Sequence, residues 1–172
     1  MTYCKNILEL KRKALSMNLC DKYKEKWDNA RTYRELINIV SDLNGADFIC
    51  AGISKGWGLE KDFITRYFGE YINGYTVYHK GYNSEIYNGL ENEEITCNVS
   101  VMIILYSKCE VIVQENHYCH IFVAGESSEV IIRNNGNVFL HDYSGNTSII
   151  DTEKSYKSKI NPYNDNHSWV NF

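Results

Sequence analysis

Hydrophobic residues in the second half of the chain recur at a spacing of eighteen residues. One series consists of Val77, Ile95, Val113, Ile131 and Ile149. A second series lies nine residues out of phase with the first and consists of Ile86, Ile104, Phe122 and Leu140. No insertion or deletion interrupts either series, and a fixed period of this length is typical of repeat proteins whose coils stack on their neighbours. The pattern predicts about five coils of eighteen residues.

Two apolar series that lie nine residues apart predict two strands in each coil, joined by two turns. We expect the first set of strands near residues 75–79, 93–97, 111–114, 129–132 and 147–150. We expect the second set near residues 84–87, 102–106, 120–124 and 138–141. Residues that favour turns, such as Asn88-Gly89, fall between these strands. Asparagine also repeats every eighteen residues, which predicts a hydrogen-bonded ladder at one corner, formed by Asn98, Asn116 and Asn134.

The first part of the chain has the periodicity of helices instead. Its clearest signal is Thr32-Tyr-Arg-Glu35, a capping box at the start of an apolar run. Asn44-Gly45 is expected to end this helix, and a further helix is expected to begin at Asp47. After Asn73-Gly74 the periodicity changes from helical to extended.

These patterns together predict an α+β fold with three parts. Residues 1–73 are expected to form a small helical bundle, and residues 74–151 are expected to form a β-solenoid. Residues 152–172 are expected to form a polar linker and an aromatic C-terminal cap, which either closes the solenoid or binds a partner.

Alternation along the second set of strands predicts one further column of side chains. If Met102 and Ile104 point inward, Ile103 and its counterparts in later coils point outward, and the two assignments can be exchanged because both sets are apolar. An outward apolar column is costly in water, so we expect the helices, a second copy of the chain or another protein to cover it. The predicted partner-binding residues are Ile103, Ile121, Phe139, Leu105, Val123, Glu110 and Glu129.

Charge is unevenly distributed along the chain. Residues 85–151 contain two Lys/Arg and ten Asp/Glu, a net charge of −8, whereas residues 1–72 have a net charge of +2. An acidic solenoid repels a phosphate backbone, so nucleic acid is not expected as a partner. A partner protein, or self-association, is expected instead.

Composition places the chain among ordinary globular proteins, with 44% hydrophobic and 23% charged residues. The longest apolar run, Val101–Tyr106, is too short to cross a bilayer, and no membrane association is expected. The six cysteines include no closely spaced pair, and no basic segment precedes an apolar stretch at the N-terminus. We therefore expect free thiols and a cytoplasmic location.

Five residues with reactive side chains lie close together in the predicted stack: His117, Cys119, His120, His141 and Asp142. Cys119 and His120 are neighbours in a strand, so they point to opposite faces and cannot bind one metal ion together. No orienting carboxylate lies at a fixed spacing from them, and no nucleotide-binding motif is present. No catalytic, cofactor-binding or metal-ligating residue is predicted.

Through its eighteen-residue columns, the region 75–151 resembles short β-solenoid modules of the β-helix kind. A helical head on a short solenoid is similar in shape to accessory and tail-associated proteins of phages and mobile elements. The leading hypothesis is a non-enzymatic protein-interaction or assembly protein. Two alternatives stay open. One is an acidic nucleic-acid mimic that inhibits a DNA-binding protein, and the other is a glycan-binding or glycan-cleaving β-helix. The latter would use outward tyrosines, namely Tyr87, Tyr106, Tyr118 and Tyr143.

Overall fold

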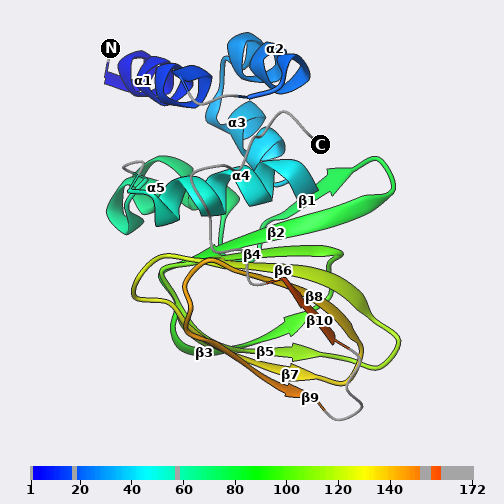
Figure 1. Cartoon of the computed structure of the whole chain (residues 1–172). Coiled ribbons are helices and arrows are strands. Elements are labelled where there is room, and N and C mark those ends of the chain that lie inside the picture. Colours follow the sequence, from blue (N-terminus) through cyan, green and yellow to red (C-terminus); the bar gives the residue numbers. More distant parts are fainter. Residues whose placement is uncertain (1, 17–18, 57–58, 152–155, 160–172) are drawn as a thin grey trace.

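A computed structural model describes residues 2–16, 19–56, 59–151 and 156–159 (Figure 1). The helices are α1 Thr2–Ser16, α2 Asp21–Asn29, α3 Tyr33–Val40, α4 Leu43–Ser54, α5 Lys61–Phe68 and the 3₁₀ helix η1 Gly69–Tyr71. The first five strands are β1 Thr76–His79, β2 Tyr82–Asn88, β3 Glu91–Cys97, β4 Val101–Leu105 and β5 Lys108–Val113. The remaining strands are β6 Tyr118–Ala124, β7 Glu129–Asn134, β8 Asn137–Asp142, β9 Thr147–Asp151 and β10 Tyr156–Lys159. The predicted α+β class is confirmed.

The strands form two sheets that face each other. The first sheet has the order β1-β2-β4-β6-β8-β10, and the second has the order β3-β5-β7-β9. From β2 onward the chain alternates between the two sheets, and strands of successive coils pair in parallel. Figure 1 shows the helices on the outer side of the first sheet, with the second sheet on the opposite side of the solenoid. The predicted β-solenoid is confirmed, with about four turns in place of five.

The turn that is missing lies at the start of the predicted solenoid. The sequence pattern places Val77 in one column with Ile95, but β1 lies in the first sheet and pairs antiparallel with β2. A two-residue loop, Lys80-Gly81, reverses the chain between them. Gly81 has a φ of 94°, a conformation that glycine adopts without steric cost. The strands β1 and β2 therefore form a hairpin and not the beginning of a coil.

The coils differ in length, so the prediction of an uninterrupted eighteen-residue repeat is wrong. In the second sheet Ile95 pairs with Val111 and Val111 with Ile132, at spacings of 16 and 21 residues. Ile132 in turn pairs with Ile149, at a spacing of 17 residues. The differences cancel over the three steps, which preserves the average period. An odd shift moves a side chain to the other face of its strand, so residues eighteen apart often point in different directions.

The predicted asparagine ladder is absent for the same reason. Asn134 pairs with Val113 and not with Asn116, which has a φ of 61° in a turn. The Asn134 carboxamide accepts a hydrogen bond from the backbone N–H of Gly136 and donates one to Asp151. Asn134 thus stabilises its own corner and the strand that follows.

Two hydrophobic cores hold the described residues together. One fills the space between the sheets and includes Ile104, Val111 and Ile132. The other lies between the helices and the outer side of the first sheet, where Ile49 and Phe68 belong to the same cluster as residues of β2, β4 and β6. The helices thus pack directly on the solenoid.

The capping box at the start of α3 is confirmed. The Glu35 N–H donates to the Thr32 side chain at 3.2 Å, and the Thr32 N–H donates to the Glu35 carboxylate at 2.9 Å. Both groups satisfy backbone donors that a helix start leaves without partners.

The predicted break at Asn44-Gly45 is wrong, because both residues lie inside α4. The Asp42 side chain accepts from the Gly45 N–H at 2.7 Å and starts this helix earlier than Asp47. A Cβ at Gly45 would lie 2.0 Å from the Ile39 carbonyl oxygen. The glycine therefore permits close contact of the α3 and α4 backbones. In the sequence alone, Asn44-Gly45 resembles a helix stop and this contact is not visible.

The C-terminal prediction can be compared with the structure only in part. Residues 156–159, which were expected within the polar linker, form β10 and pair in parallel with β8. The expected cap residues lie outside the described part of the chain, namely Ile160, Pro162, Tyr163, Trp169, Val170 and Phe172. In the described ranges no single helix has the length and apolar composition to cross a membrane. The helices α3 and α4 pass on these two criteria only when taken together, across a bend of 97°.

The contact of the β1–β2 hairpin with the end of α3 predicts a pH dependence of stability. His79 Nε2 lies 3.2 Å from the Ser41 hydroxyl and 2.9 Å from the Ser84 hydroxyl. Burial lowers the pKa of His79 below 6.5, although Asp42 nearby acts in the opposite direction and Lys26 acts in the same one. The unfolded chain therefore takes up this proton at a higher pH than the folded chain does. The contribution of neutral His79 to stability is complete above the pKa that His79 has in the unfolded chain. It is lost as the pH falls through the lower pKa that His79 has in the folded chain.

We expect His79→Gln to reduce the loss of unfolding free energy between about pH 7 and pH 5, because the variant lacks the titrating imidazole. Urea unfolding at several pH values measures this slope in both proteins. Equal slopes would show that His79 does not contribute.

Candidate functional site

The apolar residues of the predicted partner-binding column do not share an exposed surface. Ile103 and Leu105 are buried in the core between the first sheet and the helices. Ile121 and Val123 are buried in the space between the two sheets. The prediction of one accessible column is wrong, since none of these four side chains can reach a partner. The helices, one of the three expected covers, lie over Ile103 and Leu105.

Uneven coil length is the physical reason for this error. Ile103 pairs with Phe122, nineteen residues later, so Ile121 belongs to the opposite face of β6. Phe139 pairs with His120 and is only partly buried, with the two rings stacked at 4.9 Å between centroids. The helices cover the side of the first sheet that includes Ile103.

The four tyrosines proposed for glycan stacking do not form an outward row. The Tyr87 hydroxyl donates to Glu85 at 2.6 Å, and the Tyr106 hydroxyl donates to the Leu59 carbonyl at 2.9 Å. The Tyr143 hydroxyl donates to Asp47 of α4. Tyr118 is the exposed member of the four, at 50%. Of these four rings, only that of Tyr118 is exposed for contact with a glycan, and the four do not form a continuous row.

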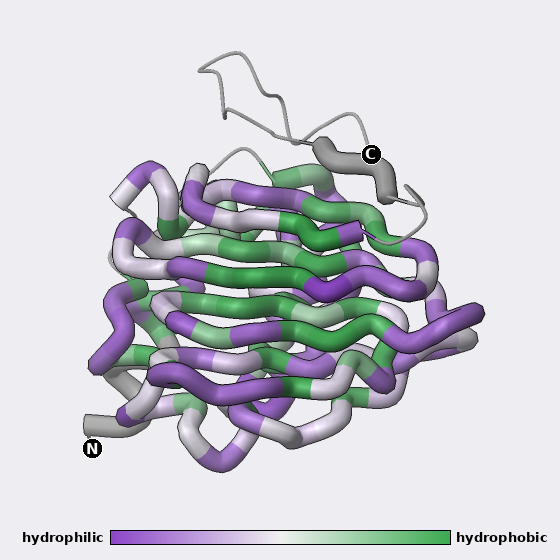
Figure 2. The backbone as a smooth tube through the Cα atoms, turned by 90° about the horizontal axis from the view of Figure 1, so that it is seen from below, coloured by the Kyte–Doolittle hydropathy of each residue, from purple (hydrophilic) through white to green (hydrophobic). Residues whose placement is uncertain are grey.

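The outer face of the second sheet combines isoleucines with carboxylates. Its strands present one outward isoleucine each from β5 onward: Ile112, Ile131 and Ile150. Ile131 is 40% exposed and Ile150 is 48% exposed. Figure 2 shows the molecule from this side, with hydrophobic stretches of successive coils lying next to one another and hydrophilic stretches beside them.

The predicted binding residues Glu110 and Glu129 lie on this face, where each has a basic partner. Lys108 lies 2.6 Å from Glu129, and Arg133 forms an ion pair with Glu110. The carboxylates raise the pKa of Lys108 and of Arg133, so both bases stay charged at neutral pH.

A shallow groove of about 590 Å³ lies on the same face. Its lining includes Glu93 and Glu94 of β3, for which the described residues provide no ion pair, together with Glu110, Glu129 and Ile131. Lys61 of α5 pairs with Glu91 at the margin, at 3.1 Å. The groove therefore has an excess of negative charge beside an accessible apolar side chain.

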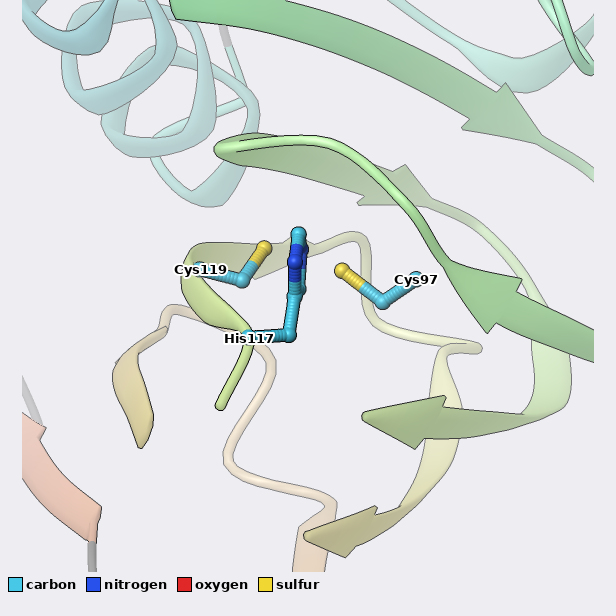
Figure 3. Close-up of side chains that lie close together, drawn as sticks. All are labelled: Cys97, His117 and Cys119. Atoms are coloured by element: carbon cyan, nitrogen blue, oxygen red, sulfur yellow. The ribbon is translucent and has the colours of Figure 1, made fainter. Parts of the chain in front are cut away.

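A second candidate site lies in the space between the sheets, at one corner of the solenoid. Cys97 ends β3, His117 precedes β6 and Cys119 lies within β6. Their ligand atoms all lie within 4.8 Å of one another. Figure 3 shows both sulfur atoms and the imidazole ring pointing into the same space. Cys97 and Cys119 are 1% and 0% exposed, and His117 is partly exposed.

The two thiols of this thiol–imidazole cluster differ in acidity. The side chain of Cys119 is the largest influence that lowers the pKa of Cys97, whereas burial acts in the opposite direction. Burial raises the pKa of Cys119. Cys97 is therefore the more acidic of the two thiols.

The five reactive residues grouped from the sequence separate into three places. His117 and Cys119 lie in the cluster, His120 and His141 lie on the outer side of the first sheet, and Asp142 lies at the turn after β8. Alternation puts Cys119 inside and His120 outside, where His120 Nδ1 lies 3.0 Å from His141 Nε2. Asp142 accepts hydrogen bonds from the turn that follows it. As expected, Cys119 and His120 point to opposite faces of the strand.

Cys97 is the residue that the sequence grouping missed. It stands just before the corner that leads to β4, and His117 stands just after the corresponding corner of the next coil. Equal coils of eighteen residues do not bring these positions together. The available signal is His117-Tyr-Cys119 at the start of β6, where residues two apart point to the same side. A correct coil register would have added Cys97 to this pair.

Comparison of the chain with protein-family models, with curated proteins and with solved structures finds no match in any of the three. The architecture therefore defines the class of protein, which is a short β-solenoid with helices packed on one of its two sheets.

Proposed function

We propose that this chain is a non-enzymatic binding protein and that the outer face of its second sheet contacts a partner protein. The observation that carries the proposal is the exposure of Ile131 and Ile150 on neighbouring strands of a regular sheet. Ile150 pairs with Arg133, two residues from Ile131, so the two isoleucines are diagonal neighbours on one face. Apolar side chains gathered in this way are typical of interaction sites.

The charges around the isoleucines favour a partner with basic residues. Five carboxylates lie on or beside this face, namely Glu91, Glu93, Glu94, Glu110 and Glu129. Two bases of the same sheet, Lys108 and Arg133, offset part of this charge. Complementary charge at the margin of an interface accelerates association and suppresses incorrect partners, while the buried apolar side chains contribute most of the affinity.

The first sheet provides less room for such a contact. Every residue of β4 is buried, since the helices cover one of its faces and the second sheet covers the other. The second sheet has helices on neither face among the elements in Figure 1. A partner can therefore reach three isoleucines there without displacing any described helix.

The test compares capture of partner proteins by the wild-type chain and by the double variant Ile131→Lys/Ile150→Lys. We expect the affinity for the captured partner to fall by at least about tenfold, because burying one isoleucine contributes about 1.5–3 kcal/mol. Tyr78→Lys is the matched control, since Tyr78 is 82% exposed on the hairpin, away from the second sheet. Circular dichroism verifies that all three proteins are folded.

Equal capture by the double variant and the wild-type chain would contradict the proposal. Light scattering on the same samples distinguishes a foreign partner from a second copy, since only self-association changes the mass of the purified chain. Binding that survives the double substitution but disappears in high salt would instead favour the acidic nucleic-acid mimic.

A further inference from the structure

We propose that Cys97, His117 and Cys119 bind one Zn²⁺ ion at the corner of the solenoid. The site would have two thiolate sulfurs and one imidazole nitrogen as ligands, with water in the fourth position. This inference is independent of the partner-binding surface, which lies on the outer side of the second sheet.

The geometry requires only a small contraction to accept the ion. Two sulfurs on a tetrahedral zinc ion lie about 3.8 Å apart, because each Zn–S bond is about 2.3 Å long. The three ligand atoms already lie within 4.8 Å of one another. His117 and Cys119 are two residues apart in an extended segment, so their side chains point to the same side, towards Cys97 (Figure 3).

The charge of the ligand set suits a buried divalent cation. Two thiolates and a neutral imidazole balance the charge of Zn²⁺, so the loaded site is neutral as a whole. Neutrality matters here because both sulfurs are buried, and an unbalanced charge in such a place is costly. Thiolate and imidazole ligands also favour zinc over calcium and magnesium, which prefer oxygen.

A backbone contact holds the imidazole ring in place. His117 Nε2 lies 2.8 Å from the Val99 carbonyl oxygen, which can only accept a hydrogen bond. Nε2 therefore carries a proton, and in the neutral ring the lone pair is on Nδ1. Histidines that bind zinc commonly donate their second nitrogen to a carbonyl in this way, which fixes the ring.

The ion would connect parts of the chain that are distant in sequence. Cys97 belongs to the second sheet, and Cys119 belongs to the first sheet in the next coil. A bound ion would therefore join the two sheets at a corner where His117 is partly exposed. Binding to the folded chain alone raises its stability by mass action.

The experiment titrates the full-length reduced chain, freed of any affinity tag, with Co²⁺ as a spectroscopic probe and then displaces it with Zn²⁺. We expect one ion per chain, absorption bands of tetrahedral cobalt with sulfur ligands, and their loss on addition of zinc. We also expect a hundredfold excess of Zn²⁺ over its Kd to raise the Tm by roughly 5–10 °C.

The variants locate the site. Cys97→Ser and His117→Gln should each weaken zinc binding by more than about 100-fold. Cys109→Ser is the matched control, because Cys109 is a buried cysteine in the same core but outside the cluster. It should bind zinc as the wild-type chain does. The partly exposed His117 provides a variant that keeps the buried residues intact, should Cys97→Ser fail to fold.

Three results would overturn the proposal. One is the absence of sulfur-to-cobalt bands in the folded, reduced wild-type chain. Another is undiminished binding in His117→Gln, which would place the ion elsewhere. The third is equal weakening in Cys109→Ser, which would mean that the core and not the cluster controls binding.

Discussion

Replacing Ile121 by alanine is expected to lower the free energy of unfolding by about 2–5 kcal/mol, because the change leaves a cavity in the core between the sheets. Ile121 is fully buried there, in the same cluster as Ile104 and Leu140. It pairs with Met102 on one side and with Leu140 on the other, so neither neighbouring strand can move in to fill the space without disturbing the next coil.

Ile131→Ala is the matched control for this prediction. The substitution removes the same atoms from a strand of the same solenoid, but the Ile131 side chain points to solvent from the outer face of the second sheet. We expect a loss of less than about 1 kcal/mol. Urea unfolding followed by circular dichroism gives both values, and similar losses would mean that the inward and outward faces have been assigned incorrectly.

The second large effect is expected at Gly136, at the corner between β7 and β8. A Cβ there would lie 2.4 Å from the Gln114 carbonyl oxygen and 2.6 Å from the His117 carbonyl oxygen. Both atoms belong to the backbone of the preceding coil, which cannot turn away as a side chain can. Gly136→Ala should therefore cost about 1–3 kcal/mol or more.

Gly69→Ala tests whether the loss is specific to this contact. Gly69 has a φ of −55° and nothing lies within 4 Å of its added Cβ, so the variant should change stability by less than about 0.5 kcal/mol. Thermal unfolding of both variants measures the difference. A Gly136→Ala variant as stable as Gly69→Ala would show that the two corners are further apart than the structure has them.

Features that depend only on residues close in sequence could be predicted. Features that depend on the pairing register between coils could not. Thr32 and Glu35 are three residues apart, and their capping box needs no knowledge of the rest of the fold. The direction of Ile121 depends on the length of two coils, because an average of eighteen does not reveal that one has 17 residues and the next has 19.

The same limitation explains why residues of one candidate site were predicted and the other site was missed. Glu110 and Glu129 were predicted as binding residues, and the structure has both on the outer face of the second sheet. Cys97 approaches His117 only through the corners of two successive coils. No local pattern in the sequence encodes that approach.

The burial of β4 on both faces has a consequence for how the chain loses its structure. In an ordinary repeat protein each coil interacts only with its nearest neighbours, and the array can fray from either end. Here the helices pack across β2, β4 and β6, so the first coils share a core with elements outside the repeat. We therefore expect those coils and the helices to unfold as one cooperative unit. Gradual opening is left to the terminal strands β9 and β10, where hydrogen exchange should be fastest among the described solenoid strands.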